Sequence, residues 1–235
     1  MKIPEDMTPT PLNVTDGVLP ANVDWRRARY VTSVKDQNAQ GNCGSGWAFS
    51  AAGALEGLWA RTRGELVDLS PQNLMDCSKP YGSYGCQPSN MDNAFKYVID
   101  YNGIASDASY PYEARNGNCR YDPQTRAATC SSYKSVEQNE LALQQAVATI
   151  GPISVGVDET DIKYYNGGVF NNPSCRKQIN HAMLLVGYDT DPATGLDYWL
   201  IKNSWGPGWG ENGYMRLARN KNQMCGISKY AYYPL

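Results

Sequence analysis

The strongest periodic pattern in the chain runs from Trp47 to about Thr62, where apolar residues recur at spacings of three and four. Such spacing gathers side chains on one face of an α-helix. The remaining face is small, with Ser50 and Gly53, so we expect this helix to be buried on most sides. Gly64 is a suitable C-terminal stop. The apolar positions are Ala48, Ala51, Ala52, Leu55, Leu58 and Trp59.

Weaker patterns predict three further helices. One opens at Ser70-Pro71, with Ser70 as the N-cap residue and Pro71 in the first turn. The other two are predicted from Asn90 to Tyr101 and from Glu137 to Ile150. The segment between the first two of these helices, from Tyr81 to Ser89, is a loop rich in glycine, serine and proline.

The second half of the chain changes character and reads as short β-strands separated by turns. Helices followed by strands predict an α+β protein with a helical N-terminal lobe and an antiparallel, barrel-like β lobe. A cleft between two such lobes is a favoured place for a functional site. The predicted strands are Ile153–Val157, Met183–Tyr188, Tyr198–Ile201 and Tyr214–Leu217.

Residues 1–19 show neither period, and we interpret them as an extended leader. This leader is either the end of a propeptide that lies near the cleft or a flexible, tag-like remnant. It contains Asn13-Val14-Thr15, a sequon that makes Asn13 a candidate glycosylation site. The folded part is expected over 20–235, with the helical lobe at about 25–130 and the β lobe at about 131–230.

Composition narrows the choice of partners. The chain has 235 residues and a formal net charge of −2, which gives no reason to expect nucleic acid or an anionic membrane as a partner. Its apolar runs are too short to span a bilayer. We expect a soluble monomer without a cofactor.

The seven cysteines indicate an oxidising compartment, with a disulfide framework and one thiol left over. Their spacings contain no C-x-x-C pair, and the chain has a single histidine, so a zinc site is disfavoured and no metal is expected. We therefore expect the protein to be lysosomal or secreted.

The segment that leads into the long helix is the most informative about chemistry. Residues 40–50 read QGNCGSGWAFS, and residue 46 at the start of the long helix is glycine. The segment resembles the C-G-S-C-W stretch that bears the nucleophile of papain-like cysteine proteases, with Gly46 in place of the second cysteine. Ser45, one residue earlier, is a poor substitute because the turn would aim it away from an imidazole.

The resemblance extends from Leu19 to Leu235 and is closest to the lysosomal cathepsins of the L, K and S type. It implies a papain-like two-lobe fold and, in the active relatives, cysteine endopeptidase activity. The motifs that carry it are LSPQNL at 69–74, DASYPY at 107–112, NHA at 180–182 and KNSWG at 202–206.

The resemblance assigns roles to three residues around Gly46. His181 would be the catalytic imidazole, Asn203 would orient its ring, and Trp205 would shield their hydrogen bond from water. The alternative for the last two is a turn asparagine and a core tryptophan. In the family, a helix N-terminus and an imidazolium together favour the thiolate form of the nucleophile.

Two motifs depart from the family pattern. The glutamine that would complete the oxyanion hole is Gln40 by its local spacing, but the loop is three residues too long and Gln37 is the other candidate. Across the cleft, Pro88 and Ser89 stand where the family has two glycines. Proline offers no N–H and serine adds a side chain, so we expect weakened pairing with an extended peptide.

The resemblance also implies a specificity pocket and a disulfide pattern. Met91, Gly156, Ile179 and Tyr230 match the pocket positions, although each is also interpretable as a core residue, and Tyr230 would make the pocket short with a polar end. The implied disulfides are Cys43–Cys86, Cys77–Cys119 and Cys175–Cys225, which leave Cys130 as a buried, inert thiol.

Without a nucleophile at residue 46, no thioester can form, and the chain is expected to be catalytically inactive. Two origins fit this expectation: a natural pseudoprotease that binds peptides or proteins in its cleft, its own leader among them, or an engineered knockout of an active cathepsin-like endopeptidase. The longer loop and the Pro88-Ser89 change favour the first origin, whereas the complete set of His181, Asn203 and Trp205 favours the second.

Overall fold

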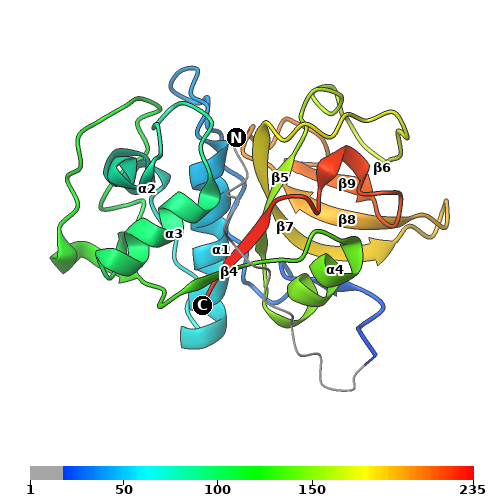
Figure 1. The fold of residues 1–235 in the computed structure, drawn as a ribbon, viewed down its shortest axis with the longest axis horizontal. Helices are drawn as coiled ribbons and strands as arrows, with labels where there is room; N and C mark the ends of the chain where they lie inside the picture. The colour runs from blue at the N-terminus through cyan, green and yellow to red at the C-terminus, as the bar shows by residue number, and fades with distance from the viewer. Residues whose placement is uncertain (1–17) are drawn as a thin grey trace.

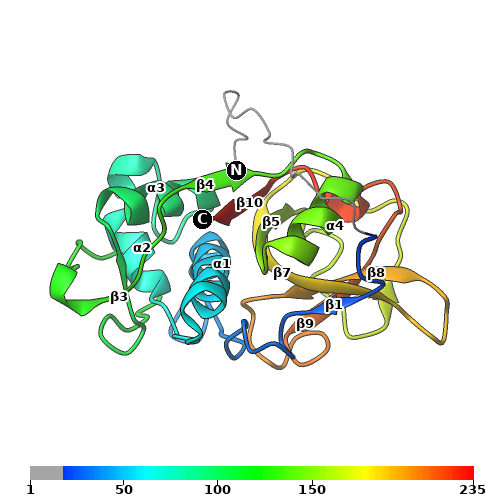
Figure 2. The ribbon, with the colours of Figure 1, turned by 90° about the horizontal axis from the view of Figure 1, so that it is seen from below.

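The computed structural model describes residues 18–235, which form a helical half and a sheet half with α1 (Gly46–Arg63) running between them (Figures 1 and 2). The helical half adds α2 (Pro71–Cys77), α3 (Met91–Asp100) and a two-stranded antiparallel sheet of β2 (Ile104–Ala105) and β3 (Arg126–Ala128). The two-lobed α+β fold expected from the sequence is confirmed.

Local signals set the helix ends as expected. The Ser70 side chain accepts a hydrogen bond from the N–H of Asn73, which satisfies one free donor at the start of α2. Gly64 ends α1 in the left-handed conformation, with φ of 74°, and its N–H bonds to the Ala60 carbonyl. Most residues of α1 are buried, as its small opposite face predicts.

The sheet half is built on the order β4-β10-β5-β7-β8-β9-β6, with β1 paired to β7. All of its pairs are antiparallel except β6 with β9. Helix α4 (Glu140–Thr149) packs beside β7. The strands are β1 (Val23–Asp24), β4 (Tyr133–Ser135), β5 (Ile153–Val157), β6 (Val169–Phe170), β7 (His181–Thr190), β8 (Asp197–Lys202), β9 (Tyr214–Ala218) and β10 (Ala231–Pro234).

Strand β7 joins the two hydrophobic cores because successive side chains of a strand point to opposite faces. Ala182, Leu184 and Val186 belong to the core shared with the helices, whereas Met183 and Leu185 belong to the core of the sheet half. This double burial explains why the segment reads as a continuous apolar run. It also fixes the position of His181, the first residue of β7, relative to α1.

The chain crosses between the halves at both ends, which the sequence pattern did not predict. Val23 and Asp24 pair with Tyr188 and Gly187 of β7, so this segment near the start of the described chain lies on the sheet. Near the other end, β10 runs between β4 and β5 at the centre of the molecule (Figure 2). The leader's candidate glycosylation site, Asn13, lies outside the described residues.

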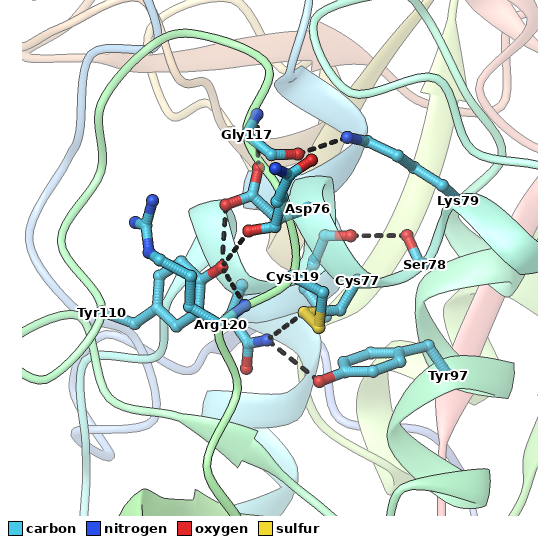
Figure 3. Close-up of a disulfide and its surroundings, with 12 residues drawn as sticks. Asp76, Cys77, Ser78, Lys79, Tyr97, Tyr110, Gly117, Cys119 and Arg120 are labelled. Atoms are coloured by element: carbon cyan, nitrogen blue, oxygen red, sulfur yellow. Dashed lines mark hydrogen bonds between the residues drawn. A yellow bond between two sulfur atoms is a disulfide. The ribbon is translucent and has the colours of Figure 1, made fainter.

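The three disulfides join the cysteine pairs that the resemblance implies. The Cys77–Cys119 bond closes the loop after α2, and Asp76 next to it accepts hydrogen bonds from the N–H of Gly117 and the hydroxyl of Tyr110 (Figure 3). Cys130 is free and buried, and burial raises the pKa of its thiol to about 12.

Candidate active site

The start of α1 faces a cleft between the two halves. Gly46 is the first residue of the helix, and the cap residue Ser45 makes no side-chain bond to it. The N–H groups in the first turn of a helix have no partner within the helix and carry partial positive charge. The Ser45 hydroxyl instead lies 2.6 Å from the hydroxyl of Tyr112 and is fully buried, away from the imidazole.

His181 faces this helix start from the sheet half. Its Nε2 lies 2.9 Å from Oδ1 of Asn203, which also accepts the N–H of Ser204 at 2.8 Å. An oxygen that accepts the amide N–H makes the imidazole the donor, so the ring carries a hydrogen on Nε2. In the neutral ring, Nδ1 therefore carries the lone pair, and it lies 3.0 Å from the position that a Cβ on residue 46 would take. Trp205 stacks on the ring, with centroids 4.8 Å apart and planes inclined by 25°.

The structure brings a further group to the imidazole that the sequence analysis missed. Glu159 follows β5 and places its carboxylate Oε2 3.6 Å from Nδ1 of His181. Burial lowers the pKa of His181, while the bond to Asn203 and the charge of Glu159 oppose this effect; the charge of Lys163 adds to it. The available signal was the position of Glu159 directly after a predicted buried strand.

The imidazole fills part of the space beside Gly46. A Cβ atom placed there in ideal geometry would lie 2.7 Å from Cε1 and 3.0 Å from Nδ1 of His181. It would also lie 3.0 Å from Oε1 of Gln37. Contacts under 3.0 Å require a shift of one partner. Residue 46 thus faces the ring directly, and the ring sits closer than a side chain at this position would allow.

The choice of Gln40 for the position beside Gly46 is wrong, because the structure places Gln37 there. Gln37 is buried, donates from Nε2 to the Cys43 carbonyl and accepts at Oε1 from the Ser204 hydroxyl. Gln40 is exposed and bonds to the carbonyl of Tyr112. The three additional residues form a turn between Gln37 and Cys43 and leave the buried glutamine in place.

The side chain that Ser89 adds does not line the cleft. It is only 3% exposed, because its hydroxyl donates to the Gln87 carbonyl and accepts the N–H of Tyr84 within its own loop. Pro88 is exposed and lines the cleft beside the segment that leads into α1, with its Cδ 3.4 Å from the position of a Cβ on Gly44. The change that bears on peptide pairing is therefore the proline, which has no N–H to offer.

Three of the four residues assigned to a specificity pocket gather at one place. A Cβ on Gly156 would lie 2.6 Å from Cγ2 of Ile179 and 3.1 Å from Cβ of Tyr230, whose hydroxyl donates to Oδ1 of Asp92. Met91 is fully buried in the helical core. All four are buried and lie outside the lining of the open cleft, so their role as a pocket stays a prediction.

The cleft has a volume of about 380 Å³. Its lining combines the start of α1 with groups from both halves, and no trio of His, Cys, Asp or Glu suited to a metal ion occurs in the described part of the chain. No helix within residues 18–235 has the length and apolar character needed to cross a membrane. The lining residues are Gln37, Asn38, Asn42, Gly44, Gly46, Trp47, Pro88, Glu159, Lys163, Asn180, His181, Ala182 and Trp205.

Two buried residues of opposite charge, Glu56 and Lys202, line a smaller cavity of about 40 Å³ and are bridged by Thr32. Thr32 donates to the Glu56 carboxylate and accepts from the Lys202 ammonium, and both charged residues are almost fully buried. Burial raises the pKa of Glu56 and lowers that of Lys202, while their mutual attraction opposes both shifts. The pair joins α1 to β8, the strand that ends just before Asn203.

The fold and the cleft define a two-lobed protein of the cysteine-hydrolase type, in which an imidazole–amide pair faces the start of a buried helix. The chain belongs to the papain family of cysteine proteases, whose sequence pattern it matches over residues 19–235. This finding confirms the resemblance inferred from the motifs, and the relatives below place the chain among the cathepsin L- and S-like members.

The chain is 50% identical over 221 residues to cathepsin S of Mus musculus, a match that covers 92% of this chain and 64% of that protein. It is 48% identical over 228 residues to cathepsin L of Sarcophaga peregrina, with 95% and 65% covered. The chain thus spans about two thirds of the length of these relatives.

Solved structures agree. Digestive procathepsin L 3 of the Tenebrio molitor larval midgut superposes with a TM-score of 0.89 at 46% identity, covering 96% of this chain and 73% of that one. Bromelain from Ananas comosus, in complex with the E64 inhibitor, gives 0.85 at 40% identity, with 92% and 99% covered.

Proposed function

We propose that this chain is a catalytically inactive papain-family protein, a natural pseudoprotease that binds a peptide or protein segment in its cleft. The single observation that carries the proposal is Gly46, which has no side chain where the first residue of α1 faces Nδ1 of His181. Cysteine proteases act through a thiolate that attacks the substrate carbonyl, and glycine has no atom to make that bond.

The surrounding geometry supports binding without turnover. The His181 ring lies within 2.7 Å of the position of a Cβ on residue 46, so the space for a nucleophile is partly filled. The buried hydroxyl of Ser45 is held by Tyr112 and does not reach the imidazole as a substitute. The cleft itself remains open and is lined by both halves.

The second candidate origin is an engineered knockout of an active cathepsin-like endopeptidase. The retained bond between His181 and Asn203, the stacked Trp205 and the buried Gln37 favour it. Pro88, which also lines the cleft, favours the natural origin, because a designer who removes a nucleophile has no need to change that residue. We infer the natural origin from Pro88 and the longer loop before Cys43.

The direct test compares the unaltered chain with Gly46→Cys and Gly46→Cys/Pro88→Gly on a fluorogenic dipeptide amide at mildly acidic pH. We expect no turnover by the unaltered chain, weak turnover by the single variant and a gain on adding the glycine. Turnover by the unaltered chain would overturn the proposal, and rapid turnover by Gly46→Cys alone would favour the knockout. The natural codon at position 46 separates the two origins independently.

The proposal extends to partner and location. We infer that the occupant is an extended peptide, with the chain's own leader as one candidate, and that the protein works as a monomer. The three disulfides and the cathepsin and digestive-proteinase relatives support a lysosomal or secreted location. Mass spectrometry of material from a eukaryotic host would test glycosylation at Asn13.

A further inference from the structure

Three hydrogen-bond acceptors from different segments line the same cleft as Gly46. They are Nδ1 of neutral His181, the carboxylate of Glu159 and Oε1 of Gln37, which we call the acceptor cluster. Nδ1 is an acceptor because Nε2 already donates to Asn203. Nδ1 and Oε1 both lie 3.0 Å from the position of a Cβ on residue 46, but Cε1 of His181 lies 2.7 Å from it, so a ligand group that meets these acceptors must sit further out in the open cleft.

Glu159 supplies the full negative charge of the cluster and lacks a close partner. Its backbone is fixed, since its N–H donates to Oδ1 of Asn180 at 2.8 Å. Within residues 18–235, its carboxylate lies 3.6 Å from the Lys163 ammonium and 3.6 Å from Nδ1 of His181, both beyond hydrogen-bond distance. Burial lowers the pKa of His181 and thus favours its neutral form.

Lys163 satisfies the carboxylate only weakly. Its side chain is 53% exposed, and exposed ion pairs of this kind contribute little to stability. The competing influence is the start of α1, whose partial positive charge disfavours a cation nearby. That partial charge is about half of an elementary charge, smaller than the full charge of the carboxylate. The cluster as a whole therefore favours a donor with positive charge.

We propose that the acceptor cluster is a subsite for a lysine side chain of the bound peptide. A primary ammonium has three hydrogens to donate, one for each member of the cluster, and its charge pairs with Glu159. The slender stem of lysine would run along the open cleft of about 380 Å³, whose lining includes all three members of the cluster. This inference rests on the proposed peptide-binding function and names the chemistry of its ligand.

Peptide binding at this subsite should be coupled to protonation of His181, which gives a second measurable property. A bound ammonium opposes protonation of the neighbouring imidazole, so the lysine peptide lowers the pKa of His181. The charged groups that face this ring are Glu159 and Lys163. By reciprocity, binding weakens as the pH falls through the pKa of His181. Because the chain has one histidine, its imidazole proton signals in an NMR spectrum need no assignment by mutation.

The test measures anisotropy of short fluorescein-labelled alanine–serine peptides that carry one lysine, norleucine or glutamate at each inner position in turn. At about pH 7.5, the best lysine peptide should bind about tenfold more tightly than its norleucine counterpart, equivalent to ~1.4 kcal/mol. Glu159→Gln should abolish this preference, so that the lysine and norleucine peptides bind with equal affinity. The matched control is Glu137→Gln, an exposed glutamate outside the cleft lining, which should retain it.

The outcomes separate this subsite from the proposed function. Equal binding of the lysine and norleucine peptides, or an unchanged preference in Glu159→Gln, would overturn the subsite and leave peptide binding intact. Tighter binding of the glutamate peptide would overturn the lysine subsite, because it would show that the partial positive charge at the start of α1 dominates the site. A free-protein pKa of His181 above its ordinary value would show the ring already paired with Glu159, which also refutes it. If no peptide binds to folded protein, both proposals fail.

Discussion

A single methyl group at residue 46 should displace the catalytic-type imidazole. In Gly46→Ala, the new Cβ would lie 2.7 Å from Cε1 of His181, whereas ordinary contacts begin at 3.4 Å. The difference, 3.4 − 2.7, requires a retreat of about 0.7 Å. The ring has little freedom to move, because Asn203 holds Nε2 at 2.9 Å and Trp205 stacks on its face. We therefore expect strain in the hydrogen bond between His181 and Asn203.

The magnitude follows from two opposing effects. Overpacking by one methyl group costs about 1–3 kcal/mol in a well-packed site. Replacing glycine by alanine within a helix returns at most about 1 kcal/mol, and less at the first helical position. The net expectation for Gly46→Ala is a loss of about 1 kcal/mol in the free energy of unfolding. Gly46→Cys should lose a similar amount, since its Cβ occupies the same place.

Urea unfolding of a double-mutant cycle measures this effect. In a His181→Ala background the ring is absent, so Gly46→Ala should become neutral or stabilising, with a coupling of about 1–2 kcal/mol between the two sites. The imidazole proton signals should also shift in Gly46→Ala. Equal effects of the alanine with and without the imidazole, or unmoved signals, would refute the reasoning.

Further predictions follow from buried groups. Glu56→Ala leaves the Lys202 ammonium buried without its counter-charge and should lower the free energy of unfolding in urea by about 3–5 kcal/mol. The double variant Glu56→Leu/Lys202→Met, which removes both charges, should lower it clearly less. An equal loss in the two variants would contradict the account based on paired buried charges. Burial lowers the pKa of His181 below its unfolded value of about 6.5, so the unfolded chain binds more protons in the interval between the two values and stability rises with pH there. The dependence should flatten in His181→Ala, measured as urea midpoints between about pH 5 and 7. The Cys130 thiol, with its pKa raised to about 12, should resist a disulfide reagent in the folded protein and react on unfolding; rapid reaction with the native protein would show that the thiol is accessible.

The sequence predicted the elements whose signals are local. The periodicity of α1, the cap at Ser70 and the stop at Gly64 depend on neighbouring residues, and the structure has each of them. The strand β1, of two residues, and the central strand β10 have no comparable local signal. They form because β7 and β5 present free edges to them, which is a property of the assembled sheet rather than of either segment.

In the site, too, the features set by local sequence were predicted, whereas those set by the folded chain were not. The motifs around His181 and Asn203 placed the imidazole and its partner, because each sits at the end of a strongly apolar strand. Spacing failed for the glutamine, since an insertion between Gln37 and Cys43 shifts the count without moving the buried residue. The burial of Ser89 could not be predicted from the sequence, because whether a short polar side chain bonds to its own loop depends on the folded backbone.

The survival of the imidazole and amide beside Gly46 has a structural explanation that needs no enzymatic activity. Asn203 joins the ring to Ser204, and Ser204 in turn donates from its hydroxyl to Gln37 and accepts the Gln37 N–H at its carbonyl. This buried network connects the segment before α1 to the sheet, so losing any member would leave buried polar groups unsatisfied. Its presence therefore carries little weight in favour of an engineered origin. Pro88 carries more, because it is exposed in the cleft and its side chain has no part in the network.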